Sequence, residues 1–139
     1  MRDQSAECLI SSSFSISSPS MDPEECTDFL EIQPSSTGKK GHKRTPQSYG
    51  QLITSFWSIG PHKEPGDDID EGMQKVLQIV WPAKERIGEY LKTRSYHASF
   101  GTTVNIYESR PLYRLRPETL QKMAFFGVEY IFDIHDYSD

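Results

Sequence analysis

The sequence predicts an α+β domain in which three or four helices pack on a small, antiparallel three-stranded sheet, preceded by a disordered arm. Two observations favour this class. Residues 1–47 are rich in serine and poor in large apolar side chains, whereas from residue 48 on the apolar residues recur at helical or strand spacing. Helices and strands in this order are typical of α+β folds. We therefore expect a disordered arm over residues 1–47 and one folded domain over residues 48–139.

The arm changes its charge along its length. Residues 1–33 carry seven acidic side chains against Arg2 alone, and a basic hinge over residues 39–44 follows. The basic side chains of the hinge are Lys39, Lys40, Lys43 and Arg44. Each lysine or arginine near an acidic bilayer contributes about 1 kcal/mol, so we expect weak contact with anionic surfaces, with a solvated linker as the alternative. Ser18 and Ser20 precede acidic residues and are candidate phosphorylation sites.

Four segments show the helical spacing of apolar residues. The first covers residues 49–57, and the second covers residues 67–80 with aspartates near its start, where acids favour a helix N-terminus. A proline then separates it from a third segment over residues 83–93. The fourth runs from Pro117 to Gly127, and these are residue types that typically begin and end helices.

Strand spacing appears in the second half of the chain. Large and small residues alternate over residues 96–106 and again over residues 128–134. Residues 112–115 are a short candidate partner strand. These three segments are expected to form the sheet.

The sequence contains no familiar catalytic or metal-binding pattern. No two of the four histidines lie at the i, i+4 spacing of a helical metal pair, and phosphate-binding glycine loops and nucleophile elbows are missing. Cys8 and Cys26 are too few for a disulfide scaffold or a four-ligand zinc site. We therefore expect a protein that is not an enzyme and that needs no cofactor or metal.

Two groups of apolar residues are candidate protein-binding sites. Phe29 and Leu30 lie in an acidic segment over residues 22–32, a composition typical of disordered segments that fold on a partner. Phe125 and Phe126 are neighbours on the fourth helix, about 100° apart, so that one packs inwards and the other points to the flank. An exposed ring of this kind favours self-association or a protein partner.

A short linear motif follows the basic hinge. Pro46 and Tyr49 belong to a Pro-Gln-Ser-Tyr stretch that departs by one residue from the Pro-Pro-x-Tyr motif. In its order of basic arm, Pro/Tyr element and aromatic helix, the segment over residues 39–57 resembles the matrix proteins of rhabdoviruses. The resemblance implies a viral structural protein of the virion that self-associates and contacts membrane through its basic arm.

These observations favour a non-enzymatic protein-interaction or assembly protein, such as a viral matrix or accessory protein. It would bind itself, a partner protein and anionic membrane. The alternative is a nucleic-acid-associated protein that uses the basic hinge and exposed aromatic rings, although the net charge of -5 disfavours this as a property of the whole chain. A small enzyme with an unrecognised site is the third possibility. Because no signal peptide or membrane-spanning apolar stretch is found, we expect an intracellular location, in cytoplasm or nucleus.

Overall fold

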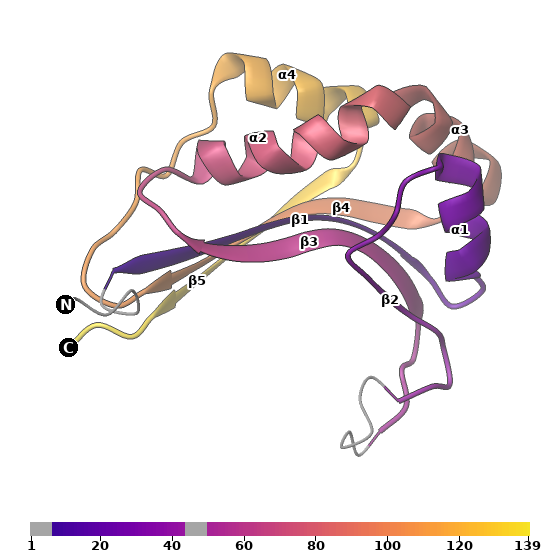
Figure 1. Cartoon of the computed structure of the whole chain (residues 1–139), viewed down its shortest axis with the longest axis horizontal. Coiled ribbons are helices and arrows are strands. Elements are labelled where there is room, and N and C mark those ends of the chain that lie inside the picture. The colour runs from indigo at the N-terminus through magenta and orange to yellow at the C-terminus, as the bar shows by residue number, and fades with distance from the viewer. Residues whose placement is uncertain (1–6, 44–49) are drawn as a thin grey trace.

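The structure, a computed structural model, describes residues 7–43 and 50–139 of the chain. It contains a five-stranded mixed sheet in the order β2-β3-β1-β4-β5, covered on one face by helices (Figure 1). The strands are β1 (Cys8–Ser18), β2 (Ser36–Gly38), β3 (Ser55–Pro65), β4 (His97–Ile106) and β5 (Glu129–Asp136). The helices are α1 (Pro23–Leu30), α2 (Ile69–Val80), the short 3-10 helix η2 (Trp81–Ala83), α3 (Lys84–Arg94) and α4 (Pro117–Phe126). The predicted three-stranded antiparallel sheet is therefore wrong.

The central strand of the sheet comes from the segment that the sequence predicts to be disordered. β1 pairs antiparallel with β3 on one side and with β4 on the other. Its apolar residues Ile10, Phe14 and Ile16 alternate with serines, face the helices and are at most 5% exposed. Ser11, Ser13, Ser15 and Ser17 lie on the opposite face, which none of the described helices covers, whereas Ser12 lies on the helix side beneath α2. A low average content of apolar residues is therefore enough here, because only one face of the strand is buried.

The remainder of the predicted arm is also ordered where the structure describes it. α1 begins at Asp22, whose side chain accepts a hydrogen bond from the N–H of Glu24, and Pro23 occupies the first turn. Cys26 and Leu30 are fully buried under this helix. Burial raises the pKa of the Cys26 thiol to about 12, as expected for a packed, unreactive cysteine. The prediction of a disordered arm is thus wrong for residues 7–43.

The predicted first helix over residues 49–57 is also wrong, because residues 55–65 form β3. Trp57 pairs with Ile16 of β1 and is fully buried, and its indole N–H donates to Thr27 Oγ1 at 3.0 Å. Ile59 lies on the same face, as the two-residue repeat of a strand requires. The apolar residues of this segment, which include Phe56 and Trp57 of β3, matched a helical repeat by spacing alone, and the long-range pairing with β1 decides the structure.

The other predicted helices are confirmed by α2, α3 and α4. Asp68 caps α2, since its side chain accepts a hydrogen bond from the N–H of Asp70. η2 contains Pro82 and separates α2 from α3. α4 begins at Pro117 and ends before Gly127, which has the left-handed conformation that glycine adopts without penalty.

The final strand is confirmed in position but not in pairing. β5 runs parallel to β4, because α4 crosses over the sheet and returns the chain to the end where β4 begins. The predicted strand over residues 112–115 is absent, and only an isolated bridge joins Leu112 to Asp68. The sheet is therefore mixed rather than antiparallel.

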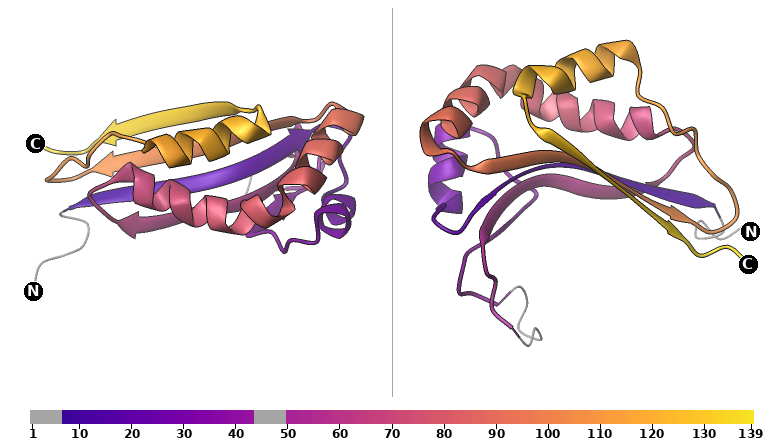
Figure 2. Two further views of the ribbon diagram at one scale, coloured as in Figure 1. Left: turned by 90° about the horizontal axis from the view of Figure 1, so that it is seen from above. Right: turned by 180° about the vertical axis from the view of Figure 1, so that it is seen from behind.

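The helices leave one face of the sheet uncovered. α2, α3 and α4 lie on the same face, and α1 packs against α3 at one end (Figures 1 and 2). The core between the layers includes the rings of Phe14, Phe100 and Phe126, whose centroids lie 5.0 to 6.0 Å apart. None of the helices in the described segments is long and apolar enough to cross a membrane.

Candidate functional site

The two edges of the sheet differ in how well they are protected. β2 forms one edge with only three residues. β2 pairs with only residues 56–58 of β3. The part of β3 that follows contains Pro61 and Pro65, which have no N–H to donate to another strand. The N–H of Gly60 donates to Ser35 Oγ at 2.8 Å and is thus already bound. This edge is therefore blunted against further strands.

β5 forms the opposite edge and has eight residues. It begins just after α4 and runs along β4, with Glu129 opposite Ser99 and Asp136 opposite Ile106. Its outer side has no neighbouring strand within residues 7–43 and 50–139. Alternate residues of an edge strand point their N–H and C=O groups outwards, so backbone donors and acceptors remain available there.

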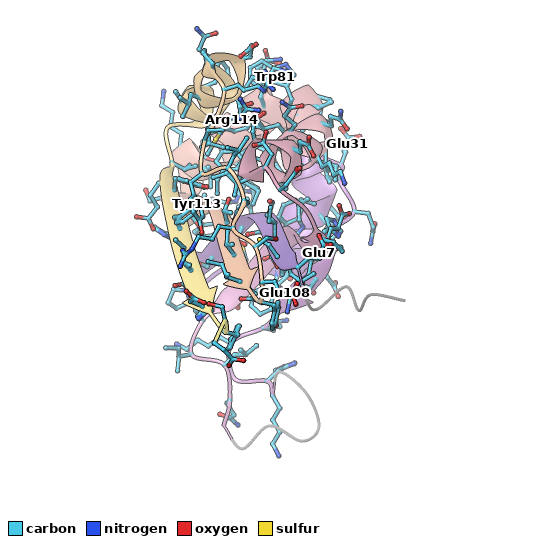
Figure 3. The ribbon with its side chains drawn as sticks, turned by 90° about the vertical axis from the view of Figure 1, so that its left-hand side faces the viewer. Glu7, Glu31, Trp81, Glu108, Tyr113 and Arg114 are labelled. Atoms are coloured by element: carbon cyan, nitrogen blue, oxygen red, sulfur yellow. The ribbon has the colours of Figure 1, made fainter. Side chains whose placement is uncertain are left out.

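On the helix side, β5 carries a row of apolar residues that becomes more exposed along the strand. The hydroxyl of Tyr130 donates to Thr102 Oγ1 at 2.7 Å, and burial raises the pKa of Tyr130. The ring of Phe132 packs edge-on against Tyr113, with 5.9 Å between centroids, and Figure 3 shows Tyr113 beside β5. Phe132 is 38% exposed and Ile134 is 43% exposed. Two large apolar side chains are therefore only partly covered.

On the open face, β5 presents charged residues around one apolar side chain. Glu129 Oε1 lies 2.7 Å from His97 Nε2, and Asp133 Oδ2 lies 3.1 Å from His135 Nε2. Ile131 lies between these two pairs and is 52% exposed. β5 thus offers unpaired backbone groups together with apolar side chains on both faces.

An ion pair fixes the connection that carries Tyr113. Asp68 Oδ2 accepts a hydrogen bond from Arg114 Nη2 at 2.7 Å, and this bond holds the pKa of the Asp68 carboxyl below its ordinary value. The buried Asp70 accepts a hydrogen bond from the N–H of Arg116 at 2.9 Å. The segment that packs on Phe132 is therefore tied to the start of α2.

A hollow between α2 and β3 is the other candidate site. It has a volume of about 90 Å³, and its lining includes Ser12, His62 and Lys75. Ser12 is 3% exposed, and its Oγ has no hydrogen-bond partner in the part of the chain that the structure describes. His62 opposes Ser12 across β1 and β3, but no hydrogen bond activates the hydroxyl as nucleophilic catalysis requires. A Cβ atom on Gly72 would lie 2.4 Å from this Oγ, so the glycine permits close packing of α2 on β1.

The predicted basic hinge is only partly described. Its described basic residues, all exposed, are Lys39, Lys40 and Lys43. They follow β2 in a connection that projects from the end of the sheet (Figure 1). The fourth basic residue, Arg44, and the short linear motif of Pro46 and Tyr49 lie outside the described residues.

The predicted protein-binding residues differ in exposure. Leu30 is fully buried, and Phe29 is partly buried with its ring 5.1 Å from that of Tyr90. Both belong to the ordered α1, so they do not form a disordered binding segment. Phe126 is 8% exposed and Phe125 is 55% exposed, as the 100° turn between helical neighbours predicts. Only Phe125 of these four presents a large exposed surface.

The exposed edge at β5 was not predicted from the sequence. A signal was present, because Tyr130, Ile131 and Phe132 are consecutive large residues and must occupy both faces of a strand. Its place at the edge depends on the order of the strands, which no local pattern reveals. In the described part of the chain, no group of three or more His, Cys, Asp or Glu side chains could hold a metal ion.

Comparison with known proteins gives a family but no function. A family model described as a domain of unknown function (DUF4279) matches residues 7–137, so the chain belongs to this family. The match overturns the resemblance of residues 39–57 to rhabdovirus matrix proteins. That resemblance depended on a helix after Tyr49, where the structure instead forms β3 from residue 55. No curated protein and no solved structure matches the chain.

Proposed function

We propose that the protein is a non-enzymatic interaction module that binds an extended segment of a partner chain beside β5. The partner segment adds a strand to the sheet. The observation that carries this proposal is the outer edge of β5, which is eight residues long and has no strand beside it among the described residues. In strand addition, main-chain hydrogen bonds give affinity and the alternate side chains give specificity.

The side chains of β5 favour such a role. Natural proteins usually protect an edge strand by making it short, by placing proline in it or by covering it with another element. The β2 edge has the first two of these features, whereas β5 has neither. Ile131 on one face and Phe132 and Ile134 on the other would be covered by a partner strand. Burial of such side chains contributes about 25 cal/mol per Å² of apolar surface.

Titration of the full-length chain with a synthetic strand tests this function. We would use a blocked peptide that alternates valine and lysine, because β5 is apolar on one face and carries Glu129 and Asp133 on the other. Backbone amide resonances of residues 129–136 should shift, and a peptide with proline at its centre should cause no shift. Shifts that avoid β5, or no shift in a monomeric sample up to about 1 mM peptide, would contradict the proposal.

A second candidate function is contact with anionic membrane through the basic hinge. The observation that favours it is that Lys39, Lys40 and Lys43, all exposed, lie together on the connection that follows β2 and projects from the end of the sheet (Figure 1). Three such charges provide a weak attachment of about 1 kcal/mol each near an acidic bilayer. Salt-sensitive binding to acidic vesicles, compared with binding to RNA, tests it and separates it from nucleic-acid association.

A further inference from the structure

We infer that the strand that pairs with β5 is β5 of a second copy of the chain. The inference rests on the proposed function and names its partner. Two β5 strands related by a twofold axis perpendicular to the sheet run antiparallel, and both helix layers stay on the same face. Both β5 edges are consumed by the pairing, so the assembly closes as a dimer and leaves the two blunted β2 edges outermost.

The arrangement of the layers leaves room for this pairing. Seen from above in Figure 2, β5 lies at the rim of the sheet, outside α4. No helix among the described elements lies beyond it on that side. Tyr113 packs on Phe132 from the helix side, and no strand of the described residues lies beyond the outer backbone edge of β5.

Strand length and charge together select one register, because an axis at Phe132 or Asp133 opposes seven residues of β5 to each other and an axis at Ile131 or Ile134 opposes only five. Opposed residues in an antiparallel pair share one face, so the twofold axis must pass through a residue of β5. With the axis at Ile131, Glu129 of each copy opposes Asp133 of the other. With the axis at Asp133, this carboxylate opposes itself. Like charges directly opposite each other destabilise a strand pair.

The register with the axis at Phe132 keeps the longer pairing and has no like charges directly opposed. Its opposed residues are Glu129 with His135, Tyr130 with Ile134, Ile131 with Asp133, and Phe132 with itself. The carboxylate of Glu129 can accept a hydrogen bond from the imidazole of His135 at both ends of the pair. On the helix side, the two Phe132 rings meet on the axis and are flanked by the Tyr130 and Ile134 side chains. The partly exposed apolar row of β5 is thus covered by the same row of the second copy.

A charge exchange between two variants tests both the dimer and its register. Glu129→Lys removes the carboxylate that faces His135, and His135→Glu places two carboxylates opposite each other. Each variant alone should dissociate at about tenfold higher concentration than the parent chain in sedimentation equilibrium. A mixture of the two variants should form a heterodimer, because a lysine then faces a glutamate at one end and the parent pair remains at the other.

Two matched controls separate this effect from changes within one copy. His97→Gln removes the ion pair of Glu129 within the chain and should leave the dimer unchanged, and Glu85→Lys makes the same charge change on the exposed side of α3. In a second test, Phe132→Cys should form an intermolecular disulfide on oxidation, because its two copies face each other on the axis. Ile131→Cys and Asp133→Cys should form it far more slowly. Both native cysteines are buried.

The possible outcomes distinguish this inference from the proposed function. A chain that stays monomeric up to about 1 mM, while the synthetic strand shifts β5, would overturn the second copy as partner and leave strand addition standing. A dimer that both charge variants leave unchanged would also overturn the inference. If neither the synthetic strand nor a second copy contacts β5, both proposals fail.

Discussion

The two edges of the sheet differ in whether their strands can pair with a further strand. The β2 edge is short, is followed by prolines in β3 and has Gly60 N–H bound by a side chain, all features that prevent further strand pairing. The β5 edge is long, free of proline and lined with partly exposed apolar residues. The projecting basic connection lies at the first edge, and acidic residues lie along the second. On the proposed function, the first edge ends the sheet and the second edge pairs with a further strand.

Replacing a residue of β1 should have the largest effect, because this strand joins the two halves of the sheet. Phe14 is fully buried against Phe100 and Phe126. Phe14→Ala should lower the free energy of unfolding by about 3–5 kcal/mol, measured by urea denaturation. Phe125→Ala, which removes a ring that is 55% exposed, is the matched control and should cost about 1 kcal/mol. Equal effects would show that β1 is not the centre of the sheet.

The ion pair that fixes the connection above β5 should show a defined pH dependence. Because Arg114 lowers the pKa of Asp68, the carboxylate stabilises the fold above its unfolded pKa of about 3.9, and this stabilisation is lost as the pH falls through the folded pKa. Asp68→Asn keeps a capping side chain but loses the charge, and should cost about 1–2 kcal/mol at pH 7. The difference from the parent chain should shrink below about pH 4.

An exposed ion pair provides the comparison for Asp68. Lys75 and Glu64 are both more than half exposed, so Glu64→Gln should leave the free energy of unfolding nearly unchanged. A pH-independent cost of Asp68→Asn, or an equal cost for Glu64→Gln, would mean that the Arg114 contact does not hold the connection in place.

A smaller effect is expected from Tyr113, which supports only the β5 edge. Its ring is 43% exposed and packs on Phe132. Tyr113→Ala should lower the free energy of unfolding by about 0.5–1.5 kcal/mol. Hydrogen exchange should become faster in β5 and stay unchanged in β2 and β3. Faster exchange throughout the sheet would show that Tyr113 belongs to the common core instead.

The basic hinge should contribute almost nothing to stability. Replacing Lys39, Lys40 and Lys43 together with glutamine should leave the thermal midpoint unchanged, because all three side chains are exposed. Salt-sensitive binding to acidic vesicles should be lost in this variant. Binding that survives the replacement would assign any affinity for anionic surfaces to another part of the molecule.

Local signals predicted the elements whose structure is decided locally. α4 has a proline at its start and a glycine after its end, and α2 has an aspartate cap, so sequence alone located both helices. β4 could be predicted for a similar reason, since its alternation spans ten residues with one buried face.

The errors arose where distant pairing decides the structure. β1 is rich in serine, and this composition is typical of disordered segments. The apolar residues of β1 are buried only because the strand pairs with β3 and β4, which are distant in sequence. Trp57 fitted a helical repeat, yet it is buried by a strand 41 positions earlier, at Ile16. The candidate site was missed for the same reason, because the edge position of β5 follows only from the strand order.

Hydrogen exchange of the full-length chain at increasing protein concentration tests the central claim most directly. If β5 is the edge that extends the sheet, amides of residues 129–136 should become more protected as the concentration rises from about 1 µM to about 1 mM. Amides of β2 should exchange at the same rate throughout. Protection in β5 that is independent of concentration, or protection that appears at β2 instead, would contradict the assignment of the two edges.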